Sequence, residues 1–256
     1  MQNIVLYSIL ADMYKKAIGS LGGRFMISRE VRALCEETGL GRWEMYFRGR
    51  CGVLGEVDAE VVVAVALFFE PGFVRAQWES GRSLPAEKAA FLYAQACANW
   101  GRRNLAFDGA GRLADLLTKA TSAASPLAAP LFAGWRALPL PEDAPARAAH
   151  ALQVAREHRG AMHSIAVAAG LIDPLMATLV GSEESGAPRT AASTAEVARF
   201  LSWPEPYPVP AEEDVEKRAR AEELTDVLVA PAYSVLTGGE AEELGELLRE
   251  AEASVK

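Results

Sequence analysis

Apolar residues recur along much of the chain at the spacing of amphipathic helices. Val5, Ile9 and Met13 follow one another at intervals of four residues, which places them on one stripe of a helix over residues 4–18. Ser28 is a typical N-cap residue and predicts the beginning of a second helix. Two glycines, at positions 39 and 41, are expected to end this second helix.

Prolines and polar clusters divide the rest of the chain into further helical segments. The Val-rich run at 61–69 has strand propensity, but its acidic start and the absence of hairpin chemistry favour a helix. Pro71 and Pro85 suit the first turns of the helices that follow. From there on, helices are expected over residues 71–80, 85–100, 109–125, 126–137, 144–169, 174–180, 194–202, 211–230 and 239–253.

Two stretches are predicted to be connections. The polar sequence GSEESGAPRT at 181–190 is typical of an exposed loop, and WPEPYPVP at 203–210 has four prolines at alternating positions, which predicts an extended path. The pattern shows no repeat and no strand ladder. We therefore expect an all-α, multi-helix globule, with a core domain at 1–183, a Pro-rich connection at 184–210, and C-terminal helices at 211–256 that pack on the core.

Composition narrows the classes of function. The formal net charge is -8 and the pI is about 5.1, which argues against non-specific nucleic-acid binding through phosphate contacts. Three widely spaced cysteines indicate neither a disulfide framework nor a zinc knuckle. The sequence shows no signal peptide and no apolar run long enough to cross a bilayer, so we expect a cytoplasmic protein without membrane contact.

The segment HALQVAREHRGAMH, residues 150–163, contains all three histidines of the chain. On a helix, His150 and Glu157 share one face, whereas Arg156, Arg159 and His163 lie together on another. Two arginines beside a histidine are suited to hold a carboxylate or phosphate and to transfer a proton near neutral pH. The alternative is a solvated face with local ion pairs, whose histidines bond to backbone carbonyls.

The histidine spacing does not favour a metal. His158 and His163 are five residues apart, not the four that bring two ligands over one ion, and the sequence has no HExxH motif. No metal and no cofactor is therefore expected.

The segment RWEMYFRGR at 42–50 is the second candidate. Tyr46, Phe47 and Arg50 are suited to wall a pocket, with Arg48 and Arg50 facing an anion. The segment alone favours the alternative, a core aromatic cluster with arginines that extend to the surface. GSLGG at 19–23 follows no strand and lacks the spacing of a phosphate-binding loop.

Three blocks resemble the SalK-like family of helical proteins from actinobacteria. REHRGAMH, preceded by SPLAAPLFAGWRALPLPEDAP, is similar to that family's Arg-Glu-His-Arg-Gly-Asp-Gly-His block; WEMYFRGR and ELTDVLVAPAYSVL resemble its N-terminal block and its Thr-Asp element. Carried over residue by residue, the resemblance implies a site made of Tyr46, Phe47, Arg50, His150, Glu157, His158, Arg159 and His163.

The chain departs from this family's pattern in two places. Ala161 and Met162 replace the Asp-Gly of the block, which removes a carboxylate. The winged-helix-like segment that precedes the Thr-Asp element, and for which relatives are described as regulators, is shortened here and filled by prolines. A DNA-reading wing is therefore less expected in this chain.

Three hypotheses follow from these patterns. The leading one is a small-molecule site, in a binding protein or a cofactor-independent enzyme of specialised metabolism, with Glu157, His158 and His163 as catalytic groups. Tyr46, Phe47, Arg50, His150 and Arg159 would then contact the ligand. The alternatives are a ligand-responsive transcriptional regulator, and self-association of the chain as a homodimer through the 150–163 helix.

Overall fold

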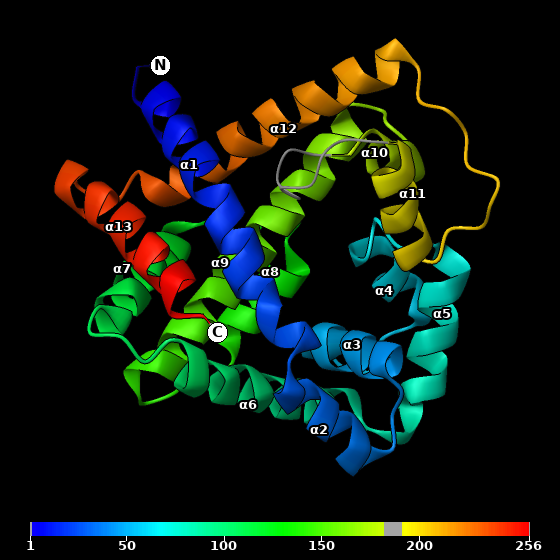
Figure 1. The fold of residues 1–256 in the computed structure, drawn as a ribbon, viewed down its shortest axis with the longest axis horizontal. Helices are drawn as coiled ribbons and strands as arrows, with labels where there is room; N and C mark the ends of the chain where they lie inside the picture. Colours follow the sequence, from blue (N-terminus) through cyan, green and yellow to red (C-terminus); the bar gives the residue numbers. More distant parts are fainter. Residues whose placement is uncertain (1, 182–190, 256) are drawn as a thin grey trace.

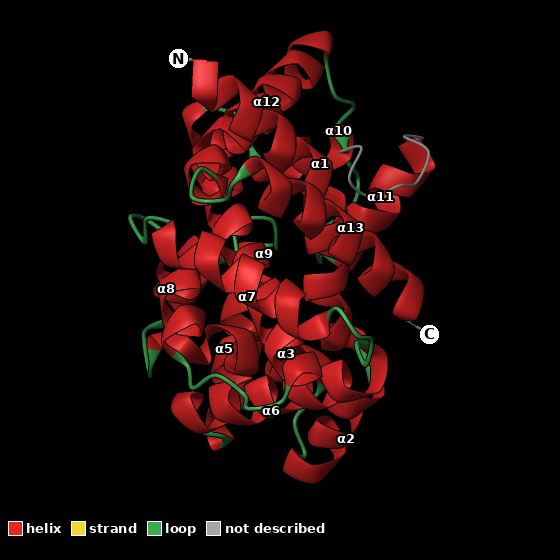
Figure 2. Ribbon diagram, turned by 90° about the vertical axis from the view of Figure 1, so that its left-hand side faces the viewer, coloured by secondary structure: helices red, strands yellow, loops and turns green. Residues whose placement is uncertain are grey.

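The computed structural model describes residues 2–181 and 191–255. All regular structure in these residues is helical and none of it is strand, so the all-α prediction is confirmed (Figure 1, Figure 2). The helices are α1 (Gln2–Arg24), α2 (Arg29–Thr38), α3 (Arg42–Cys51), α4 (Ala59–Val65), α5 (Pro71–Ser80), α6 (Ala86–Asn104), α7 (Ala110–Ala123), α8 (Pro130–Ala137), α9 (Ala144–Ala169), α10 (Pro174–Val180), α11 (Ala191–Phe200), α12 (Glu212–Tyr233) and α13 (Gly238–Ser254).

Capping residues explain several of the observed bounds. The Ser28 hydroxyl accepts a hydrogen bond from the Val31 amide at the beginning of α2, and Gly39 ends that helix at a φ of 73°. Asp143 caps α9 and Asp173 caps α10. The predicted spans 144–169 and 174–180 are therefore confirmed.

Two predictions needed correction. The first helix does not end at residue 18 but continues through GSLGG to Arg24. The Val-rich run is helical only to Val65, after which residues 66–70 form turns. Glu70 then caps α5, its carboxylate accepting from the Gly72 and Phe73 amides. The turn segment 66–70 becomes one wall of the cleft described below.

Helix α9 is the centre of the molecule, and α1, α6, α7, α8 and α12 pack around it (Figure 1). Two glycines permit the closest approaches. A Cβ at Gly22 would lie 2.7 Å from the Leu152 carbonyl oxygen, and one at Gly101 would lie 2.5 Å from the Pro145 carbonyl oxygen. Both helices thus rest almost backbone to backbone on α9.

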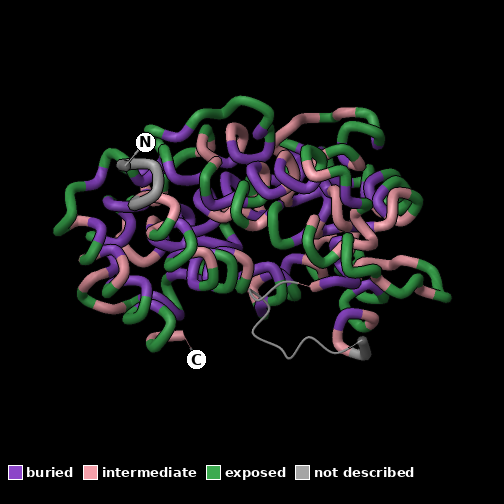
Figure 3. The backbone as a smooth tube through the Cα atoms, turned by 90° about the horizontal axis from the view of Figure 1, so that it is seen from above, coloured by how far each residue is buried: buried purple, intermediate pink, exposed green. Residues whose placement is uncertain are grey.

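The C-terminal helices share the main hydrophobic core with the N-terminal ones. Helix α12 packs against α1 and α9, and α13 packs against α1 and α7. The main core includes Leu21 of α1, Val229 of α12 and Leu244 of α13, and buried segments run throughout the tube of Figure 3. The division into 1–183, 184–210 and 211–256 stays a prediction, and its first boundary lies outside the described residues.

Helices α10 and α11 pack against each other at one edge of the bundle. Residues 203–210, between α11 and α12, have neither helix nor strand, as their prolines predict. The Trp203 indole donates to the Phe68 carbonyl oxygen at 2.8 Å, and the Glu70 amide donates to the Leu201 carbonyl oxygen at 3.0 Å. The end of α11 is therefore fastened to the 66–70 segment.

Among the described helices, no single one is long and apolar enough to cross a membrane; α9 and α10 pass that test only as a pair bent by 106°.

Candidate functional site

The three segments that carried the family resemblance meet in space on α9. From α3, Arg50 forms a two-pronged ion pair with Glu157, in which Nε and Nη2 each lie 2.8 Å from a carboxylate oxygen. From α12, the Thr225 hydroxyl lies 2.9 Å from Nδ1 of His163, and Glu222 lies 3.2 Å from Nη2 of Arg159. The blocks predicted from sequence thus form one polar layer.

Glu157 is the most heavily bonded member of this layer. It is 2 % exposed, and it also accepts from Nε2 of Gln153 at 2.8 Å and from Nη1 of Arg156 at 3.1 Å. Burial raises the pKa of Glu157, but the charge and hydrogen bonds of Arg50 outweigh that effect and hold the pKa below its usual range. Glu157 is therefore an ionised carboxylate between two guanidinium groups.

A second group of charges joins α9 to α12 and α1. Besides Glu222, Arg159 lies 3.9 Å from Asp226, which in turn lies 3.5 Å from Lys15 of α1. Arg218 of α12 pairs with Glu222. Residues 213–224 form local i,i+4 ion pairs, and Arg218 among them lies buried against α10.

Beside the polar layer, a cleft of about 820 Å³ opens between α1, α3, α8, α9, the 66–70 segment and the end of α11. Its volume lies within the range of small-molecule sites. Trp43 is the centre of its aromatic wall, with ring centroids 5.5 Å from Phe69 and 5.0 Å from Phe200. Arg42 lies over both Trp43 and Phe200.

Half of the sequence-predicted site residues line this cleft: Tyr46, Arg50, Glu157 and Arg159. Their partners in the prediction lie elsewhere. Phe47 is fully buried in the cluster around Trp78. His150 is buried near Trp135, His158 contacts Phe132 and His163 stacks on Phe68, none of them in the cleft wall.

The histidines are also poorly placed for proton transfer at neutral pH. Burial lowers the pKa of His150 and of His158 to about 4, and burial with the charge of Arg218 lowers that of His163 to about 3. All three are therefore neutral near pH 7. The Thr225 hydroxyl donates to the Ala221 carbonyl oxygen, so Nδ1 of His163 is the donor toward Thr225.

The alternative interpretation of the 156–159 segment, a solvated face with local ion pairs, does not hold for Glu157 and Arg159, which are 2 % and 8 % exposed. Arg156 does form a local pair with Glu157, but the partners Arg50 and Glu222 come from α3 and α12.

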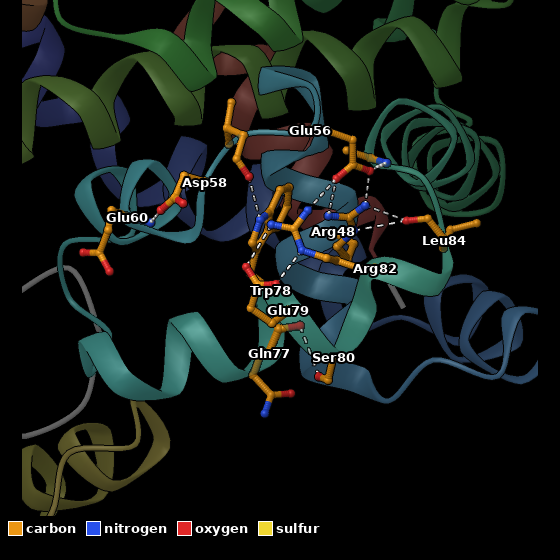
Figure 4. A network of polar contacts seen from close by, with 12 residues as sticks. Arg48, Glu56, Asp58, Glu60, Gln77, Trp78, Glu79, Ser80, Arg82 and Leu84 are labelled. Carbon is orange, nitrogen blue, oxygen red and sulfur yellow. Dashed lines mark hydrogen bonds and ion pairs between the residues drawn. The ribbon is translucent and has the colours of Figure 1, made fainter.

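Arg48, predicted together with Arg50 to face an anion, is instead a structural residue (Figure 4). Its side chain is fully buried over the Trp78 ring, donates twice to the Leu84 carbonyl oxygen and pairs with Glu56. Arg82 also pairs with Glu56, which completes the network drawn in Figure 4. Arg48 therefore holds α3 against the start of α6.

Gly160, Lys16 and Gly19 were missed as site residues in the sequence, whereas Arg156 was predicted on the anion-binding stripe with Arg159. Arg156 and the neighbouring Gly160 of α9 line the cleft, as do Lys16 and Gly19 of α1. The available signal for Gly160 was its place four residues after Arg156, on the same face of the helix. The available signal for Gly19 was the glycine-rich GSLGG, which is informative only when this segment is known to be helical.

The described part of the chain has no group of three or more His, Cys, Asp or Glu side chains placed to hold a metal ion.

Comparisons with known proteins give one match. A family model described as a helix-turn-helix family matches residues 11–256. No curated protein and no solved structure is significantly similar to the chain. The resemblance to the SalK-like family stays a prediction.

Proposed function

Because the chain belongs to this helix-turn-helix family, matched over residues 11–256, we propose that it is a ligand-responsive regulator whose effector site is the cleft beside α9. The small-molecule site expected from the sequence and the regulator alternative are then two parts of one function. The cleft binds an effector, and α11, whose end lies at the cleft, responds to it.

The observation that carries this proposal is the position of α11 at the cleft. Phe200 and Leu201, at its end, line the cleft, and Phe200 contacts Trp43. Trp203 and Leu201 bond to the 66–70 segment, which lines the cleft as well. A molecule in the cleft would therefore contact the residues that position α11, and its binding energy would bias that position.

Binding is favoured over acid–base catalysis at this site. The three histidines are neutral near pH 7 and do not line the cleft, and Glu157 is held ionised by Arg50. A general base needs access to its substrate and a pKa near the working pH. The catalytic roles predicted for Glu157, His158 and His163 therefore have little support from this arrangement.

Family membership supports binding to DNA, and the charges on α11 indicate how strong this binding is. Arg199 is the basic residue among the described residues of α11, and it pairs with Glu205 at 2.6 Å. Phosphate contacts from α11 are therefore few, so we expect DNA affinity to be modest and to depend only weakly on salt concentration.

Selection from a random duplex pool at low salt tests the regulator. We expect one sequence to be enriched and its affinity to change several-fold in Gly160→Leu, because a leucine at this position enters the cleft. Gly239→Leu on α13 is the matched control, since an added Cβ at either glycine meets no other atom within 4 Å. If no duplex is enriched at low salt, the regulator is abandoned. If one is enriched but Gly160→Leu binds it like wild type, the cleft is not an effector site.

A further inference from the structure

The charges around the cleft indicate the chemistry of its ligand. Six basic side chains and two acidic ones line the cleft, although the chain as a whole carries a formal charge of -8. The basic residues are Lys15, Lys16, Arg42, Arg50, Arg156 and Arg159. The cleft is therefore a local positive concavity on an acidic protein, which attracts anions.

Most of these cations already have an acidic partner, but Arg156 shares its own. Arg50 takes both oxygens of Glu157, and Arg159 and Lys15 face the acids of α12. Arg156 bonds to Glu157 through Nη1 alone, so that two guanidinium groups share one carboxylate. The side chain of Arg156 is 27 % exposed in the cleft wall. Arg156 thus lines the cleft without a counter-charge of its own, as do the exposed Lys16 and Arg42, which form no ion pair with the described residues.

The aromatic wall reaches the charge of Arg156 through Arg50, whose Nε bonds to the same oxygen of Glu157, Oε1, as Nη1 of Arg156. The Tyr46 hydroxyl lies 3.3 Å from Nη1 of Arg50, and the Tyr46 ring is 5.6 Å from the Trp43 ring. From Trp43 the wall continues to Phe69 and Phe200. A guanidinium and a flat apolar surface therefore lie on two sides of one tyrosine.

Two glycines leave open space in the cleft. Gly19 of α1 and Gly160 of α9 line the cleft from opposite helices, and a Cβ added at either would meet nothing within 4 Å. Side chains at these positions would point into open space instead of into the core. We therefore regard both as positions that set the size of the ligand.

We infer that the cleft binds an aromatic organic anion, whose acidic group pairs with Arg156 and whose ring body packs on the wall formed by Trp43, Phe69 and Phe200. This inference rests on the proposed function, because it names the ligand class of the same site. Arg156 supplies a charge-assisted hydrogen bond to the acidic group. The aromatic residues supply apolar contact area and ring stacking.

Two fluorescent probes separate charge from shape. Anilinonaphthalene sulfonate is an aromatic anion, and phenylnaphthylamine has the same ring body without the sulfonate. We expect the folded wild-type protein to bind the sulfonate one to one and more tightly than the neutral probe. Arg156→Gln should weaken the sulfonate about tenfold or more and leave the neutral probe unchanged, because it removes only the ionic contact.

Substitution of the glycines tests whether the probes bind in the cleft. Gly160→Leu and Gly19→Leu should weaken both probes, whereas Gly239→Leu on α13 should weaken neither. Far-UV circular dichroism and the melting temperature of each variant show whether the fold is retained.

The outcomes distinguish this inference from the proposed function. Suppose that both probes bind wild type equally, that Arg156→Gln changes neither affinity and that Gly160→Leu weakens both. The cleft then takes neutral molecules, so the anionic ligand class is overturned and the effector site stands. If neither glycine substitution affects either probe, or if neither probe binds, both the ligand class and the effector site are overturned.

Discussion

Arg50 and Glu157 are separated by 107 residues in the chain, yet their side chains form a buried two-pronged ion pair with both N–O distances at 2.8 Å. This pair joins α3 to the central helix α9. The same arginine supplies its carbonyl oxygen to the Trp135 indole of α8 at 3.0 Å. One residue thus connects three helices around the floor of the cleft.

Replacing Glu157 by glutamine should destabilise the fold by roughly 3–5 kcal/mol, because Arg50 would be left as an uncompensated buried charge. Urea unfolding followed by circular dichroism measures the loss. Glu60→Gln is a matched control, since Glu60 pairs with Arg75 on the surface, where ion pairs contribute little. A Glu157→Gln variant as stable as the control would show that the ion pair does not hold α3 in place.

The helical spans were predictable from sequence because their signals are local. Asp143 and Pro145 mark the start of α9, and the spacing of the apolar residues carries it to Ala169. The surroundings of α9 were not predictable in the same way. The partners of Glu157 and Arg159 come from positions 107 and 63 residues away, which no helical pattern reveals.

The candidate site was predicted in part for the same reason. A helical wheel correctly places Arg156 and Arg159 on one side of α9, but it does not show that Phe68 covers His163. The predicted first helix stops at residue 18, before GSLGG, whose glycines disfavour a helix. Tertiary packing overrides this preference, since Gly22 is what allows α1 to contact the backbone of α9.

The buried histidines predict a marked loss of stability in mild acid. Their pKa values, about 4 for His150 and His158 and about 3 for His163, lie below the value of about 6.5 in an unfolded chain. Between these limits the unfolded state binds more protons than the folded state, so the free energy of unfolding falls as the pH falls. Each of the first two histidines contributes roughly 3 kcal/mol between pH 6.5 and 4.

Urea midpoints measured from pH 8 to pH 4 check this expectation. In His158→Gln, the slope of the free energy of unfolding against pH should be smaller below pH 6. The decrease should be about 1.4 kcal/mol per pH unit, which is the contribution of one proton. A wild-type midpoint that stays constant from pH 7 to pH 5 would contradict the burial of neutral histidines.

Two glycines should respond in opposite directions to the same substitution. Gly160→Ala should raise stability by about 0.5–1 kcal/mol, because alanine favours the helix and its Cβ meets open space. Gly22→Ala should lower stability, because its Cβ would lie 2.7 Å from the Leu152 carbonyl oxygen and force α1 away from α9. Melting temperatures of the two variants suffice as the measurement. Equal shifts in the same direction would mean that helix propensity alone governs both sites.

The contact between Phe200 and Trp43 should control the local stability of α11 more than that of the whole molecule. Phe200 is 50 % exposed, so its truncation removes little buried area and should leave the global melting temperature nearly unchanged. Phe200 nevertheless lies on the cleft wall beside Trp43 and under Arg42. In Phe200→Ala we therefore expect faster hydrogen exchange in α11 and in residues 66–70, measured by mass spectrometry.

Val197→Ala is the matched control for this measurement, because Val197 lies on the same helix with 43 % exposure and does not line the cleft. Exchange in α11 should change less in this variant, since it leaves the cleft contact intact. Filling the cleft with anilinonaphthalene sulfonate should slow exchange at the same two segments of the wild-type protein, because the ligand adds contacts to Phe200 and to residues 66–70. If both variants exchange alike, the packing of α10 holds α11 in place, and occupancy of the cleft has no route through Phe200 to α11.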